Sequence, residues 1–239
     1  MPPEILYILG GALLASFVVG AAGFGDGIMA AAIWLHVLLP VEAVPLILAI
    51  GILIHGTNLY KLWGQLDFRH LKSFLIPGII GVPFGVYLLQ HAPPDLFKLG
   101  MGIFLIAYSL FMLFSPKTVI KCGGSGVDAV FGGTGGVVCG FAGLTGIIPA
   151  IWCGLRNWPK EQQRGVFQPF FVVLDIIALG LLAWGGMVTR DTGINLLWCV
   201  PAIIIGTWVG LKVYRHINDQ TFKKVVLVLI FLSGVMLVV

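Results

Sequence analysis

Two ionisable residues interrupt long apolar stretches of the sequence, each near the middle of its stretch. His55 lies within residues 42–64, and Asp175 lies within residues 162–186. An ionisable side chain is costly in hydrocarbon, so such residues usually mark a path for a proton, an ion or a substrate. We expect the two to form a pair that couples proton movement to transport. The alternative is a histidine bonded to a main-chain carbonyl and an aspartate facing a water-filled crevice.

Polar residues share helix faces with these two. Asn58 follows His55 by three positions, and Gln168 lies four positions from Arg164 and seven from Asp175. Residues at these spacings lie on one side of a helix. The amides suit hydrogen bonding to an oxyanion, and Arg164 would add a positive charge. The alternatives are hydrogen bonds between helices for the amides and a role in membrane topology for the arginine.

Two glycine-rich stretches, GAAGFGDG at 20–27 and GFAGLTG at 140–146, lie inside otherwise apolar sequence. Each glycine costs a helix about 1 kcal/mol relative to alanine, so both stretches predict a helix break. A helix that restarts after a break offers N–H groups and a positive dipole end to an anion. The residues expected to bind substrate here are Gly20, Gly23, Gly25, Asp26, Gly27, Gly140, Gly143, Thr145 and Gly146.

Two questions stay open at these breaks. The glycines also fit a seam of small residues that packs two helices together. Asp26 is suited either to carrying a proton or to capping a helix that starts near Gly27.

The composition predicts a polytopic membrane protein without a separate soluble domain. Of its 239 residues, 59% are apolar and 10% are charged, with a mean hydropathy of +1.03. The start, MPPEILYILGG, lacks the positive region of a cleavable signal, so its apolar run is interpreted as mature structure. The four cysteines have neither CxxC nor metal-ligand spacing. No nucleotide loop or hydrolase motif occurs, so we expect no enzyme activity, no cofactor, no metal and no nucleic-acid partner.

Ten apolar segments are expected, in two sets of five, and the fold class is therefore all-α. They cover residues 5–22, 27–39, 42–64, 71–90, 95–115, 127–143, 144–157, 162–186, 193–214 and 220–239. Matching residues recur at an offset of 120 near the start of the two halves and 125 near their end, which indicates an internal duplication. The expected organisation is a first repeat at 1–115, a cytoplasmic linker at 116–126 and a second repeat at 127–239.

The basic residues predict the topology, because Lys and Arg in short loops stay in the cytoplasm. Twelve of the fourteen fall on one side if both termini lie outside, and only Lys98 and Arg190 remain on the other. Five segments per repeat then turn the second copy upside down, as in many secondary transporters. Each glycine break would tip a hairpin that ends within the membrane, and His55 and Asp175 would approach each other at its centre.

On these features the chain resembles the TauE/SafE family of membrane permeases, often called sulfite exporters. The resemblance covers essentially the whole chain and rests on the two glycine-rich stretches, on Arg164-Gly165, and on a GxxxG pair late in each half. It implies two related halves in an inner membrane and the movement of sulfite, sulfonates and related anions. The chain departs from the family pattern at Asp26, where the glycine run usually continues, and at Thr145 and Ile147.

We therefore expect a secondary transporter for a small oxyanion, in contact with the lipid bilayer of a cell inner membrane. Two alternatives from other classes remain. One is a cation or metal transporter with Asp26, His55 and Asp175 as ligands, and the other is a membrane assembly factor that transports nothing.

Overall fold

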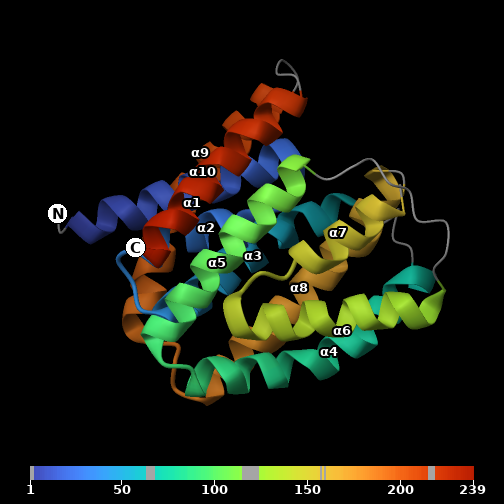
Figure 1. Ribbon diagram of the computed structural model, residues 1–239, viewed down its shortest axis with the longest axis horizontal. Helices are drawn as coiled ribbons and strands as arrows, with labels where there is room; N and C mark the ends of the chain where they lie inside the picture. Colours follow the sequence, from blue (N-terminus) through green and yellow to red (C-terminus); the bar gives the residue numbers. More distant parts are fainter. Residues whose placement is uncertain (1–2, 63–67, 115–123, 157, 159, 215–218) are drawn as a thin grey trace. The chain divides into compact units, whose positions relative to one another are not determined.

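The computed structural model describes residues 3–62, 68–114, 124–156, 158, 160–214 and 219–239, and throughout these residues it is all-helical (Figure 1). The helices are α1 (Pro3–Ala22), α2 (Asp26–Trp34), α3 (Pro40–Leu62), α4 (Phe68–His91), α5 (Pro94–Phe114), α6 (Ser125–Ala142), α7 (Ile147–Leu155), α8 (Lys160–Trp184), α9 (Arg190–Tyr214) and α10 (Asp219–Val238). Each predicted apolar segment overlaps one of them, so the all-α fold class is confirmed.

Two of the helices, α2 and α7, have nine residues each. At 1.5 Å per residue they are about 13 Å long, less than half of the ~30 Å hydrocarbon core of a bilayer. They are therefore too short to cross a membrane alone. The predicted second segment, 27–39, extends beyond α2, which ends at Trp34. The next helix, α3, has its own start signal at Pro40. Pro40 occupies the first turn of α3, and Glu42 accepts a hydrogen bond from the main-chain N–H of Leu39 at 3.0 Å.

Six helices of the described part are long and apolar enough to cross a membrane. Their spans are Glu4–Ala21, Pro40–Tyr60, His70–His91, Pro94–Phe114, Gly165–Trp184 and Arg190–Val213. A shorter apolar stretch, Lys224–Val238, lies in α10. The chain is thus a multi-pass membrane protein.

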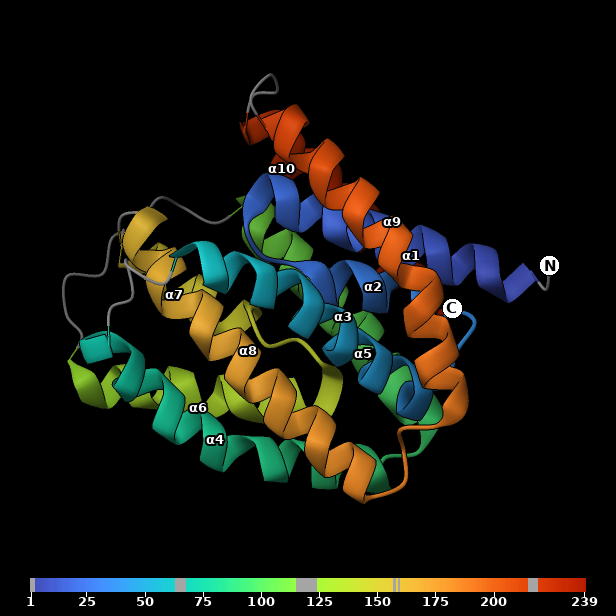
Figure 2. The ribbon, with the colours of Figure 1, turned by 180° about the vertical axis from the view of Figure 1, so that it is seen from behind.

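The chain forms two compact units, and each takes helices from both halves of the sequence (Figures 1 and 2). The first unit contains residues 1–47, 92–116 and 190–239, and the second contains residues 48–91 and 117–189. In the first unit α1 packs on α9, and in the second α6 packs on α4. In both cases the first helix of one half packs on the fourth helix of the other. The boundaries of the sequence repeats stay a prediction.

Glycines bring the two packed pairs close, at equivalent positions of the two halves. A Cβ atom at Gly85 would lie 2.1 Å from the carbonyl oxygen of Val137, and one at Gly210 would lie 2.3 Å from that of Phe17. Gly210 follows Gly85 by the offset of 125, and Val137 follows Phe17 by the offset of 120.

The same correspondence holds for Gly20 and Gly140. A Cβ atom at Gly20 would lie 2.7 Å from the carbonyl oxygen of Thr207, and one at Gly140 would lie 2.3 Å from that of Val82. One helix seam is therefore formed twice, which supports the internal duplication. The inverted orientation of the two halves in the membrane stays a prediction.

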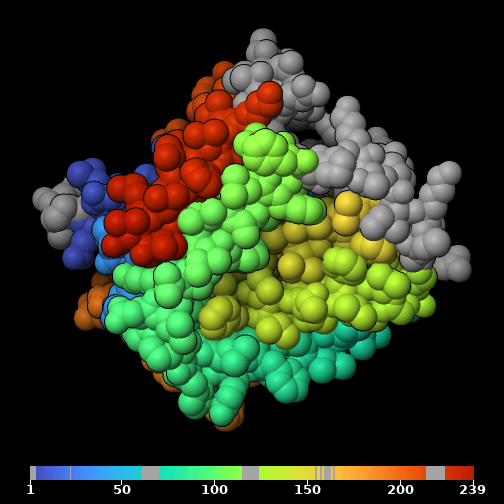
Figure 3. Space-filling model, viewed as in Figure 1, coloured from blue at the N-terminus to red at the C-terminus, as the bar shows by residue number. Residues whose placement is uncertain are grey.

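A third close pair lies within the first unit. Gly102 and Gly234 face each other, and a Cβ atom on either would lie 2.9 Å from the carbonyl oxygen of the other. Helices α5 and α10 consequently lie side by side on the face shown in Figure 3.

Candidate functional site

Both glycine-rich stretches interrupt the helix, and they do so with the same backbone geometry. Gly23 has φ 89° and Gly143 has φ 71°, values in the left-handed region that favours glycine. The N–H of Gly23 donates to the carbonyl of Val19 at 2.7 Å, and that of Gly143 donates to Cys139 at 2.8 Å. A left-handed glycine with a bond to the residue four positions earlier is a common helix C-terminus. The predicted breaks are confirmed.

The first break belongs to the first unit and leads into α2. Gly25, with φ 102°, holds the N-cap position, and no side chain caps the helix there. Asp26 is thus the first residue of α2 and not its cap, which corrects the capping interpretation. Asp26 and the next residue, Gly27, are both buried in the first turn of α2. The helix dipole favours the negative charge of the Asp26 carboxylate at this end of the helix.

The second break is tied to α8 by a hydrogen bond between side chains. The hydroxyl of Thr145 donates to Oδ1 of Asp175. The thiol of Cys139, on α6, donates to the same oxygen at 3.7 Å. All three residues are buried. One carboxylate oxygen therefore gathers two donors, one from the break and one from the helix that precedes it.

A second polar pair links α3 to α8. Nδ1 of His55 lies 3.0 Å from Oε1 of Gln168, and both side chains are buried. An amide oxygen only accepts hydrogen bonds, so Nδ1 carries the proton in this contact. The ring of Phe171 meets the His55 ring edge to face, with 4.8 Å between the ring centroids.

The two polar pairs belong to one face of α8. Gln168, Phe171 and Asp175 are spaced by three and four residues, which places them on the same side of the helix. Phe171 also contacts the second break, because a Cβ atom at Gly146 would lie 2.9 Å from its ring. We call His55, Cys139, Thr145, Gln168 and Asp175 the polar cluster. It lies within the second unit.

The structure places the other predicted site residues elsewhere. Gly20 and Gly140 face the backbones of neighbouring helices in the two seams. Asn58 is partly buried on α3, one turn beyond His55. The position of Arg164 falls in α8, but its side chain lies outside the described part of the structure. The direct pairing of His55 with Asp175 stays a prediction.

Sequence reasoning missed three groups that the structure brings into contact. Cys139 precedes Gly143 by one helical turn, and Phe171 lies between Gln168 and Asp175 on the same face. The third is a network around Asp128, which is a carboxylate in an apolar segment. Asp128 lies at the start of its apolar segment, 127–143, so the criterion that selected Asp175, an ionisable residue near the middle of an apolar stretch, does not select it.

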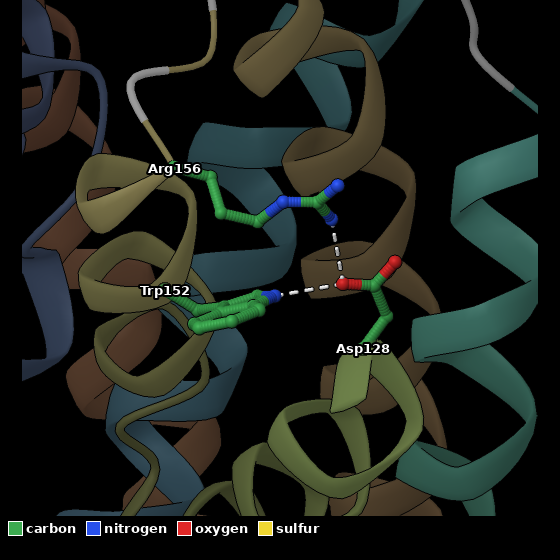
Figure 4. A network of polar contacts seen from close by, with 3 residues as sticks. All are labelled: Asp128, Trp152 and Arg156. Carbon is green, nitrogen blue, oxygen red and sulfur yellow. Dashed lines mark hydrogen bonds and ion pairs between the residues drawn. The ribbon is translucent and has the colours of Figure 1, made fainter. Parts of the chain in front are cut away.

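Asp128 lies in the first turn of α6 and accepts two hydrogen bonds (Figure 4). One comes from Trp152 in α7 and the other from Arg156, the residue that follows α7. Nε1 of Trp152 lies 2.7 Å and Nη1 of Arg156 lies 2.9 Å from its Oδ1 atom. The guanidinium also lies near the rings of Trp152 and Trp158, 5.7 Å and 5.1 Å from their centroids. Arg156, one of the basic residues that predict the topology, is therefore one half of a largely buried ion pair.

The described residues contain no group of three or more His, Cys, Asp or Glu side chains that could hold a metal ion. The polar cluster instead combines a carboxylate that accepts from a hydroxyl and a thiol with an imidazole that donates to an amide. Such groups donate hydrogen bonds to an anion and take up or release a proton.

Comparison with known proteins identifies a family. The model of the family described as "Sulfite exporter TauE/SafE" matches residues 8–237, nearly the whole chain. Searches of the curated proteins and of the solved structures found no match.

Proposed function

The chain belongs to the sulfite exporter TauE/SafE family, and we propose that it is a proton-coupled secondary transporter for a small oxyanion, either sulfite or an organosulfonate. The family's members are transporters, and the six long apolar helices fit a multi-pass protein of a cell inner membrane. In this function the cargo crosses the membrane unchanged, so no bond is made or broken in it.

The observation that carries the proposal is the contact between Thr145 and Asp175 at the second break. Breaks in membrane helices persist where protein or a water-filled cavity satisfies their backbone groups, and transporters place substrate sites there. Here the break supplies a hydroxyl and the start of α7, and α8 supplies a carboxylate and an amide. An oxyanion would accept hydrogen bonds from the first N–H groups of α7 and from the hydroxyl, whose single proton would turn from Asp175 to the anion.

Coupling to protons follows from the charge of Asp175. A carboxylate and an oxyanion in one buried site repel each other, so one proton on the carboxylate favours anion binding. His55 is suited to exchanging that proton, because an imidazole with an ordinary pKa of about 6.5 titrates in the physiological range. Proton and anion would then load together, and the gradient of one would drive the other.

Transport by the purified protein in proteoliposomes tests this function. We expect radiolabelled sulfite or sulfoacetate to accumulate in response to an imposed pH gradient and zinc ions to remain outside. Uptake of zinc without uptake of either anion would support the cation transporter. Absence of both kinds of uptake would support the non-transporting alternative.

A further inference from the structure

We propose that Asp128 is a positioning residue for the second glycine break. The inference rests on the proposed function and extends it to a residue outside the polar cluster. By holding the far end of α7, Asp128 fixes where the near end of α7, and with it Thr145, meets Asp175.

The backbone alone leaves the direction of α7 open. A single left-handed glycine, Gly143, ends α6, and a short turn leads into α7. A helix of nine residues is rigid over its ~13 Å length. Fixing one end of α7 against α6 therefore determines where the other end lies.

The contacts of Asp128 supply that fixation. Its Oδ1 atom accepts from Trp152 and Arg156, which lie one helical turn apart. The indole of Trp152 also stacks on Phe131 of α6, with 4.4 Å between the centroids and 11° between the planes. Two hydrogen bonds and one stacked ring thus join α6 to the end of α7 that is remote from the break.

The contacts around Asp128 and Arg156 extend to α4 as well. Arg156 lies against the ring of Trp158, which meets the rings of His70 and Phe74 edge to face at 4.9 Å and 6.3 Å. A buried carboxylate is costly without partners, and its removal takes the ion-pair partner away from the Arg156 guanidinium. Apolar packing alone would be enough to hold a single helical turn at this place, without a charged group.

The first break has a neutral counterpart. There the indole N–H of Trp34 donates at 3.2 Å to the main-chain carbonyl of Ile8, the position that matches Asp128 at the offset of 120. In both halves an indole of the short helix therefore donates to the long helix before it, and in the first half the acceptor carries no charge. The charged version accompanies the break whose hydroxyl contacts Asp175.

Asp128→Asn tests the proposal, because it keeps an acceptor for Trp152 and removes the charge that holds Arg156. We expect the half-saturating sulfite concentration for uptake to rise roughly tenfold, the size of one charged hydrogen bond, with an unchanged maximal rate per folded protein. Trp152→Phe keeps the stacked ring, loses one donor and should act in the same direction. Asp191→Asn, at an exposed aspartate in the first turn of α9, is the matched control and should change neither value.

A melting cycle with Thr145→Val gives a readout that does not depend on transport. If Asp128 positions Thr145, the losses in melting temperature of Asp128→Asn and Thr145→Val in detergent will not add in the double variant. Additive losses, or an unchanged half-saturating concentration in a folded Asp128→Asn protein, would overturn the proposal. If the wild type takes up no sulfite, the transport function fails and the melting cycle still decides on Asp128.

Discussion

The chemistry of the polar cluster depends on a few atoms. Oδ1 of Asp175 accepts from both Thr145 and Cys139, so a proton taken up by this carboxylate belongs on its other oxygen. His55 donates to Gln168 through Nδ1, so in the proposed function Nε2 is the ring nitrogen that would gain or lose a proton. Of the five groups in the cluster, the imidazole and the carboxylate are the two that can change charge, and the hydroxyl, the thiol and the amide are the three that donate or accept hydrogen bonds.

His55→Gln should flatten the pH dependence of net transport and leave exchange of anion for anion running. Glutamine keeps the polarity of the site but cannot titrate. Uptake at a series of pH values, compared with counterflow of labelled for unlabelled sulfite, measures both properties. His91→Gln is the matched control, because His91 is exposed at the end of α4. An unchanged pH profile in His55→Gln would leave His55 as an ordinary buried histidine.

Asp175→Asn should have the same effect on coupling as His55→Gln. If the two residues exchange one proton, the double variant should be no worse than the more damaged single variant. The pH gradient formed during sulfite efflux gives the number of protons per anion for each variant. Independent, multiplying effects would contradict a shared proton.

Much of the site could be predicted at this scale, since polar residues in apolar sequence are conspicuous. His55, Gln168 and Asp175 were predicted on that ground and Thr145 by its place in the second glycine break, and the structure joins the four in two contacts. Cys139 was not, because a cysteine resembles any small apolar residue in sequence. Which donor bonds which acceptor depends on the approach of separate helices, and sequence spacing within one helix does not contain it.

Among the elements, the glycines have two distinct uses that sequence alone did not separate. Gly20 and Gly140 serve helix packing, whereas Gly23 and Gly143 end helices with a positive φ. All four lie in the same two stretches. The seam interpretation and the break interpretation are therefore both right, each for different residues.

Gly136→Ala should destabilise the protein, and Gly133→Ala on the same helix should not. A Cβ atom at Gly136 would lie 2.0 Å from the carbonyl oxygen of Gly78, whereas one at Gly133 meets nothing closer than 3.6 Å. Overpacking costs about 1–3 kcal/mol, and alanine in a helix regains about 1 kcal/mol. Thermal unfolding in detergent compares the two. Equal melting temperatures would show that α4 and α6 approach less closely than described here.

Gly23→Leu and Gly143→Leu test the breaks as parts of the site. We expect both to abolish transport, because bulk at a break blocks the approach of an anion to the backbone. Left-handed φ adds a strain of about 1–2 kcal/mol for a residue with a Cβ atom, so only protein that remains folded in the membrane is compared. Wild-type uptake by a folded Gly23→Leu or Gly143→Leu protein would remove that break from the site.

For the whole molecule, the number and order of helices followed from apolar segments and glycine breaks. The division into two units did not, because each unit combines helices from both halves. Seam contacts between α1 and α9 and between α4 and α6 create this division. Glycine patterns that lie far apart in the sequence do not indicate which helix packs against which.

The predicted topology can be checked with two single cysteines in a cysteine-free background. Asp95→Cys, at the start of α5, should react with an impermeant thiol reagent added outside the cell, and Ser125→Cys, at the start of α6, should not. Both positions are exposed, so access depends on the side of the membrane alone. Reaction of both after lysis is the control. Labelling of Ser125→Cys in intact cells would contradict the inverted arrangement of the repeats.

The binding of the transported anion at the second break is tested most directly by the half-saturating sulfite concentration of Thr145→Val. This variant keeps the size of the side chain and removes the hydroxyl. Thr134→Val makes the same change at an exposed threonine of α6 that bonds only main-chain carbonyls in the described structure. We predict a roughly tenfold higher half-saturating concentration for Thr145→Val and the wild-type value for Thr134→Val. Wild-type half-saturation in Thr145→Val would contradict an anion site at this break.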